Sequence, residues 1–152
     1  MMVAELAALA LLLWPASQET PDEAALVAVE SQGNTWAVGS RGERGRWQAL
    51  PVSACARFGL PGHARTSATR QALCRAQARR VAWLLHVPKI GQAAGRGVLA
   101  RYRARCAAQA RGRPRRQAFG IQRCAVAAYN AGAPRWSRTD YLIRWETARS
   151  KR

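Results

Sequence analysis

Residues 20–33 have the sequence Thr-Pro-Asp-Glu-Ala-Ala-Leu-Val-Ala-Val-Glu-Ser-Gln-Gly, which predicts a short and largely buried helix. Thr20 and Glu23 fit a capping box, and the proline after Thr20 suits the first helical position. Gly33 is a natural helix stop. Glu30 then lies in the last turn, where the helix dipole and the apolar surroundings both disfavour ionisation. A raised pKa suits a general acid working near neutral pH, so Glu30 is a candidate proton donor.

Three other segments have apolar residues at helical spacing, namely residues 69–86, 98–110 and 119–131. In the second, Val98, Tyr102 and Cys106 fall on one face. The third is apolar nearly all round, which indicates a buried helix ending at Gly132. Strand patterns and internal repeats are missing. We therefore expect a mainly α fold, a single domain with little or no β structure.

Composition agrees with one domain, because 152 residues of which 49% are hydrophobic can build one core and not two of ordinary size. The net charge is +17, from 25 Lys and Arg against 8 Asp and Glu. This charge favours a polyanionic partner, although a GC-rich coding sequence would also enrich Arg. The Arg-rich residues 111–116 are expected to form an exposed loop.

The first residues resemble a targeting segment. An apolar run over residues 6–14 is followed by Pro-Ala-Ser, which predicts a signal peptide at residues 1–18 and a domain at residues 19–152. The run is too short to span a bilayer. Residues 1–5 lack the usual positive charge, and a buried N-terminal helix is the alternative. The expected location is periplasmic or extracellular.

The chain has four cysteines, and their spacing is not that of a metal site. An even number in an exported domain favours two disulfides, with three possible pairings. The alternative is four reduced, buried thiols. The cysteines are Cys55, Cys74, Cys106 and Cys124.

Several short segments, in this order, resemble the motifs of the soluble lytic transglycosylase family, which has a lysozyme-like fold. They are residues 30–34 (Glu-Ser-Gln-Gly-Asn), 37–38 (Ala-Val), 42–48 (Gly-x-x-Gly-x-Trp-Gln), 128–132 (Ala-Tyr-Asn-Ala-Gly) and 141–145, where only the tyrosine is identical. Between residues 54 and 122 we find no motif of the family.

The resemblance implies that the chain cleaves the β-1,4 bond between N-acetylmuramic acid and N-acetylglucosamine in peptidoglycan. Glu30 would protonate the bridging oxygen and then take the proton of the sugar's own 6-hydroxyl, which closes a 1,6-anhydro ring without water. One carboxylate is then enough. A hydrolase usually needs two, and Glu43 could be the second, although its Gly-Glu-Arg-Gly setting favours a surface position paired with Arg44 or another Arg.

The resemblance also implies roles for five other side chains. Ser31 would orient Glu30 or the substrate, and Tyr141 would support Glu30 without touching the sugar. Gln48, Tyr129 and Asn130 would line the groove and hydrogen-bond the sugar or its N-acetyl group. Ser31 could instead be only a helix-end residue, Tyr129 plain core and Asn130 a left-handed cap. The family implies no cofactor and no metal.

The chain departs from the family at Arg46, where the family has an apolar residue, so we expect a charge beside the groove. Trp36 and Trp47 could stack on sugar rings or pack in the core. The expected partner is the peptidoglycan strand, bound by a monomer or by a component of a cell-envelope machine. A lysozyme-type hydrolase, a degenerate wall-binding relative and an Arg-rich nucleic-acid-binding module are the alternatives, although no nucleic-acid-binding motif accompanies the charge.

Overall fold

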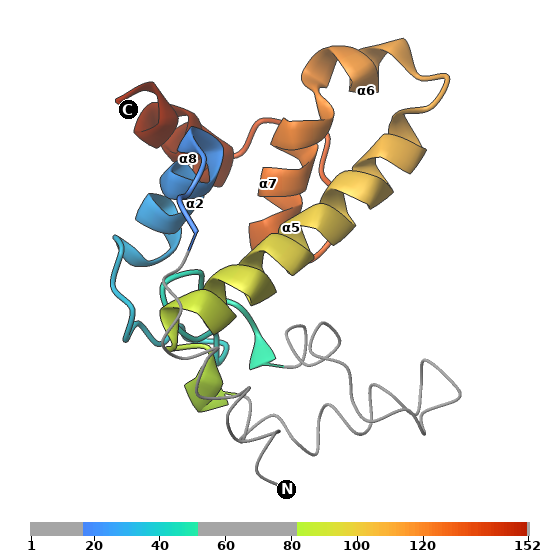
Figure 1. Cartoon of the computed structure of the whole chain (residues 1–152). Helices are drawn as coiled ribbons and strands as arrows, with labels where there is room; N and C mark the ends of the chain where they lie inside the picture. The colour runs from blue at the N-terminus through green and yellow to red at the C-terminus, as the bar shows by residue number, and fades with distance from the viewer. Residues whose placement is uncertain (1–16, 52–81, 152) are drawn as a thin grey trace, which may run out of the picture.

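The computed structural model describes residues 17–51 and 82–151, and this part of the chain is mainly helical (Figure 1). Its main helices are α2 (Pro21–Ser31), α5 (Pro88–Ala110), α6 (Pro114–Phe119), α7 (Ile121–Ala131) and α8 (Asp140–Ser150). Within these ranges the only β structure is two isolated bridges. The expected mainly α fold is confirmed. No helix of the described part is long and apolar enough to cross a membrane.

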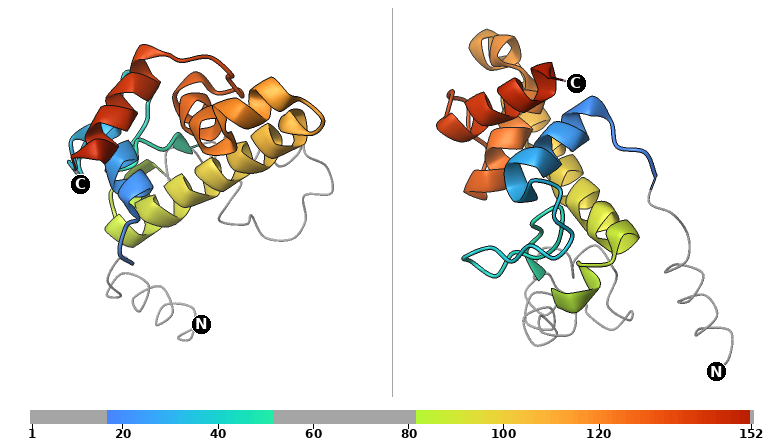
Figure 2. Two further views of the ribbon diagram at one scale, coloured as in Figure 1. Left: turned by 90° about the horizontal axis from the view of Figure 1, so that it is seen from above. Right: turned by 90° about the vertical axis from the view of Figure 1, so that its left-hand side faces the viewer.

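The helices form two contacting pairs, and one helix of each pair, α7 or α8, contacts the other pair. The long α5 packs against α7, α2 packs against α8, and α7 contacts α8. Figure 2 shows the same arrangement from two other directions, with α6 at the far end of α5. The loop after α2 lies beside the first half of α5 (Figure 1).

Helix α2 begins and ends as its sequence predicts. The Thr20 hydroxyl accepts from the Glu23 N–H at 3.3 Å, and the Glu23 carboxylate accepts from the Thr20 N–H at 2.9 Å. At the other end Gln32 is left-handed with φ +54°, followed by Gly33 with φ +82°. Both residues turn the chain away from the helix axis. Glu30 therefore lies in the last turn of α2.

Helix α5 begins at Pro88, ten residues earlier than expected, so the prediction of a helix starting at Val98 is wrong. The first turns of α5 contain glycines, which have a low helix propensity, so the sequence pattern does not predict a helix there. Packing requires those glycines: a Cβ on Gly95 would lie 2.3 Å from the Trp47 ring, and one on Gly91 would lie 2.6 Å from the Leu85 carbonyl oxygen. The buried face of Val98, Tyr102 and Cys106 is confirmed. Most of the helix expected at residues 69–86 lies outside the described residues.

Residues 111–116 are not a simple loop, because Pro114 begins the short helix α6. The arginines at positions 111, 113 and 115 are nevertheless exposed, as expected. Gly120, with φ +96°, separates α6 from α7, so the helix expected from Phe119 starts at Ile121. It ends at the left-handed Gly132, as the sequence predicts.

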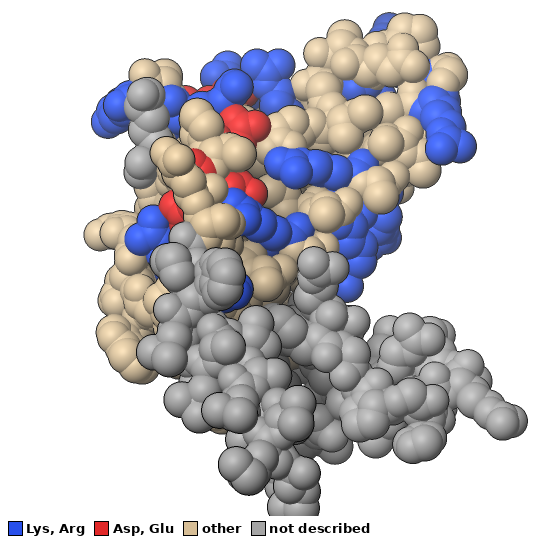
Figure 3. Space-filling model, viewed as in Figure 1, with Lys and Arg blue, Asp and Glu red and all other residues tan. Residues whose placement is uncertain are grey.

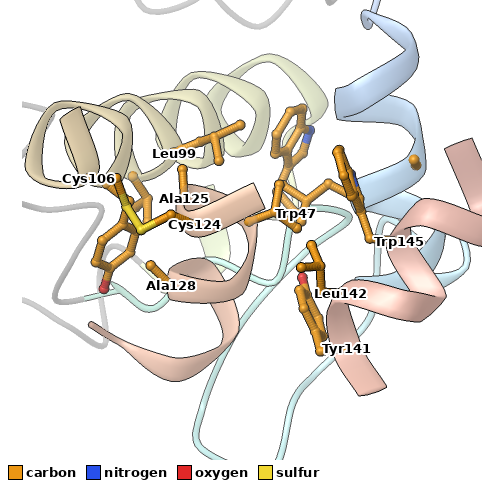
Figure 4. Packing of buried hydrophobic residues seen from close by; sticks show 14 of the residues in the cluster. Trp47, Leu99, Cys106, Cys124, Ala125, Ala128, Tyr141, Leu142 and Trp145 are labelled. Carbon is orange, nitrogen blue, oxygen red and sulfur yellow. A yellow bond between two sulfur atoms is a disulfide. The ribbon is translucent and has the colours of Figure 1, made fainter. Parts of the chain in front are cut away.

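The core lies where α5, α7 and α8 meet the loop after α2 (Figure 4). Trp47 and Trp145 are 1% and 2% exposed, so core packing is the role of Trp47. A disulfide joins Cys106 of α5 to Cys124 of α7. This disulfide is one of the two that the sequence predicts. The other two cysteines, Cys55 and Cys74, lie outside the described residues, and so does the expected signal peptide except for its last two residues, 17 and 18.

Candidate functional site

The loop after α2 is held in a compact turn that faces the helix end. Arg44 bridges to both Val38 and Ala49. Gly45 has φ +76°, and a Cβ there would lie 2.1 Å from the Leu85 carbonyl oxygen, so only glycine fits. Gln48 is also left-handed, with φ +46°, and its side-chain amide donates to the Gly45 carbonyl at 2.8 Å. The predicted Gly-x-x-Gly-x-Trp-Gln segment is thus a rigid shelf.

Ser31 fastens this turn to α2. Its hydroxyl donates to the Arg46 carbonyl at 2.6 Å and accepts from the Gly33 N–H at 3.2 Å. The side chain does not line the pocket beside Glu30. The structure therefore gives Ser31 an indirect role, in which it fixes the shelf relative to the helix that carries Glu30.

One pocket brings together four of the predicted site residues, Glu30, Gln48, Tyr129 and Asn130. Gln48 comes from the shelf, and Tyr129 and Asn130 come from the last turn of α7. The Tyr129 hydroxyl donates to the Trp47 carbonyl at 2.7 Å, which ties α7 to the shelf. Burial raises the pKa of Tyr129 well above its usual value, so its hydroxyl stays protonated. Asn130 is exposed and lines the same pocket.

Glu30 has the electrostatic properties that the sequence predicts. Burial raises its pKa to about 7, opposed by a hydrogen bond from the Tyr141 hydroxyl and helped by the negative charge of Glu43. The positive charges of Arg41 and Arg144 lower the pKa. Glu30 therefore exists as acid and carboxylate in comparable amounts near neutral pH, so it can both give and take a proton. Tyr141, which is 6% exposed on α8, lies behind Glu30 and does not line the pocket.

Glu43 lies in the same pocket, which corrects the expectation of a surface side chain: it is 8% exposed. Its Arg partner is Arg41 rather than Arg44, with Nε donating at 2.7 Å, and the Arg41 N–H donates to the second oxygen at 2.9 Å. Burial acts to raise the pKa of Glu43, but backbone N–H groups and Arg41 outweigh it and lower the pKa. Glu43 is thus a carboxylate, and each of its two oxygens accepts one hydrogen bond from Arg41.

The charge of Arg46 is not beside this pocket, so that expectation is wrong. Its guanidinium donates to Glu19 at 2.8 Å and lines a different hollow, together with Thr35 and Gln92. A residue that faces away cannot narrow the groove. Arg46 is not among the residues that line the pocket of Glu30.

Besides Arg41, Ala49 and Leu50, sequence reasoning missed two lining residues of α5, Val98 and Tyr102. Both belong to the face predicted as core, and a helical pattern does not separate core from the floor of a pocket. All three tyrosines of the chain, at positions 102, 129 and 141, surround Glu30 or line its pocket. The small number of tyrosines is the only feature of the sequence that could have drawn attention to Tyr102.

Trp36 is 75% exposed and stacks on His86 at a centroid distance of 5.3 Å, so it is not core. A larger surface hollow lies between α2, α7 and α8, lined by the ion pairs Arg123–Glu146 and Arg149–Asp22. It contains no predicted residue, so the pocket of Glu30 is the candidate site. The described residues hold no group of three or more His, Cys, Asp or Glu side chains placed to bind a metal.

No protein-family model, curated protein or solved structure matches this chain.

Proposed function

We propose that this protein is an exported peptidoglycan lytic transglycosylase with Glu30 as its single general acid and base. The observation that carries the proposal is the setting of Glu30: a half-buried carboxyl at the end of α2, held by the Tyr141 hydroxyl, with a pKa of about 7 and a small pocket of about 60 Å³ beside it. A tuned acid beside a pocket with polar groups is the usual mark of a catalytic site.

The reaction would run in two proton transfers. The protonated carboxyl of Glu30 gives its proton to the bridging glycosidic oxygen while the bond from that oxygen to C1 of the muramic acid breaks. The 6-hydroxyl oxygen of the same sugar then bonds to C1, and its proton goes to the Glu30 carboxylate. Glu30 returns to its starting state and no water is consumed.

The environment of Glu43 favours this route over hydrolysis. A general base must have a lone pair aimed at water, and an attacking nucleophile must reach C1. Both oxygens of Glu43 accept from Arg41, and its lowered pKa makes it a weaker base. Its charge can still stabilise the positive charge that develops on the sugar. Hydrolysis remains the competing activity because Glu43 lines the same pocket.

The polar groups of the pocket suit an N-acetyl sugar. The Tyr129 hydroxyl uses its proton on Trp47 and keeps acceptor capacity for a substrate hydroxyl or N–H. Gln48 and Asn130 offer amide groups, and Val98 with Leu50 supplies apolar surface for a methyl group or ring face. We place the enzyme in the periplasm or outside the cell, as a monomer.

The test compares wild-type protein, Glu30→Gln and the control Glu146→Gln on purified peptidoglycan. Glu146 is an acid on α8 whose ion pairs with Arg123 and Arg138 lie outside the pocket. Wild type and control should release anhydro-ended muropeptides, and Glu30→Gln should release none. Activity retained in Glu30→Gln would remove Glu30 from its role. No product from wild type, with binding preserved, would indicate a wall-binding relative.

A further inference from the structure

Charge is distributed very unevenly along this chain. All eight acidic residues lie outside residues 44–139, and that segment carries 20 of the 25 Lys and Arg residues. Figure 3 shows the consequence on one face: acidic side chains gather on the side of α2 and α8, and Lys and Arg extend along α5 towards α6. Some of these arginines lie next to the pocket of Glu30.

Two arginines of α5 lie over a side chain that lines the pocket. The guanidinium carbons of Arg101 and Arg105 are 5.7 and 5.9 Å from the centroid of the Tyr102 ring. Tyr102 lines the pocket, whereas both arginines are exposed and contact its ring from outside the pocket lining. The contact with the ring is a cation–π arrangement, which orients each guanidinium without neutralising it.

Two more arginines act on Glu30 itself, because the positive charges of Arg41 and Arg144 both lower its pKa. The guanidinium of Arg144 lies 5.8 Å from the centroid of the Tyr141 ring, whose hydroxyl holds Glu30. Arg41 lines the pocket and also donates to the Asn130 carbonyl at 3.4 Å. We refer to Arg41, Arg101, Arg105 and Arg144 as the arginine rim.

The rim carries positive charge that the described part of the protein does not balance. Only Arg41 forms an ion pair, with Glu43. Arg101, Arg105 and Arg144 pair with no carboxylate among the residues that the structure describes, and all three are exposed. Exposed cations around a half-protonated acid favour a ligand that brings its own negative charge to the margin of the pocket.

We propose that the arginine rim binds the carboxylates of the peptide stems on the glycan strand, and so selects strands with free peptide carboxylates. This inference rests on the proposed function. The sugar backbone that would enter the pocket is neutral, and the carboxylates of peptidoglycan are on the peptide stems that branch from this backbone. Guanidinium groups bind carboxylates through two parallel hydrogen bonds, and the four arginines of the rim lie on the pocket or on the tyrosines next to it.

Binding to insoluble peptidoglycan tests the inference separately from catalysis. The probe is the full chain carrying Glu30→Gln, titrated onto native peptidoglycan and onto the same material after carbodiimide amidation of its carboxylates. Exposed ion pairs contribute up to about 1 kcal/mol each, so native material should bind about three- to tenfold more tightly. Adding Arg101→Gln and Arg105→Gln should remove most of that preference and leave binding to amidated material unchanged.

The matched control adds Arg113→Gln and Arg115→Gln, which remove the same charge from exposed positions of the α6 region that do not line the pocket. It should keep the preference. Equal losses in rim and control variants, or equal binding of native and amidated material, would overturn the inference. If wild type releases no product but the preference depends on the rim, the proposed function fails and the carboxylate site stands.

Discussion

Replacing Glu30 by Gln is expected to stabilise the protein, and the gain should depend on pH. The pKa of Glu30 rises from 4.5 to about 7 on folding, mainly because of burial. Each pKa unit corresponds to about 1.4 kcal/mol, so the carboxylate costs at most about 3.5 kcal/mol once it is ionised. Gln keeps an oxygen that can accept from Tyr141 and has no charge to bury.

The raised pKa of Glu30 determines how the stability of the variant differs from that of wild type as the pH changes. A carboxyl with a raised folded pKa has no penalty below its unfolded value, and the penalty is complete above the folded value. The free energy of unfolding of the Gln variant should therefore match wild type near pH 4 and exceed it by a growing amount between about pH 4.5 and 7. Urea unfolding followed by circular dichroism at several pH values measures this directly.

Glu43 provides a control of opposite sign. Its pKa is lowered in the folded protein, so its ionised form stabilises the fold above its usual pKa and this contribution is lost as the pH falls. Glu43→Gln should thus be destabilised at neutral pH and approach wild type in acid. A Glu30→Gln variant that lost stability at neutral pH would contradict the raised pKa of Glu30 on which the proposed mechanism depends.

Three further outcomes are expected. Tyr141→Phe removes a hydrogen bond to a charged group, worth about 1.5–3 kcal/mol, so the alkaline limb of the pH–activity profile should move up by about one to two pH units; an unchanged limb would separate Tyr141 from Glu30. Gly95→Ala places a methyl group 2.3 Å from the Trp47 ring and should cost about 1–3 kcal/mol in urea unfolding, whereas a neutral result would contradict the close packing of α5 on the shelf. The double variant Cys106→Ser, Cys124→Ser opens a link with a sequence separation of 18 and should lose about 3 kcal/mol, and a thiol assay on denatured wild type should detect none from this pair.

The sequence predicts those features of the structure that depend on residues close together in the chain. The capping box, the left-handed stop after Ser31 and the place of Glu30 in the last turn depend on neighbours within a few residues. The end of α7 at Gly132 is equally local. These features place Glu30 and Tyr129 near two helix ends, whereas their meeting in one pocket is what the family resemblance implies.

The features that sequence reasoning missed depend on distant partners. Helix α5 includes poor helix formers because Trp47 and Leu85 leave no room for a side chain beside two of its glycines. Arg46 turns away because Glu19 binds it, and Glu43 is buried because the shelf folds around it. Tyr102 belongs to a face that is both core and pocket floor, which periodicity cannot separate.

The most direct test of the central claim is digestion of peptidoglycan in water enriched with heavy oxygen, followed by mass measurement of the muramic acid ends. The account predicts anhydro ends, lighter by one water than hydrolysis products, with no heavy oxygen incorporated. Reducing ends that each contain one heavy oxygen would contradict it, because they would show that water attacks C1 and that Glu30 acts with a second catalytic group.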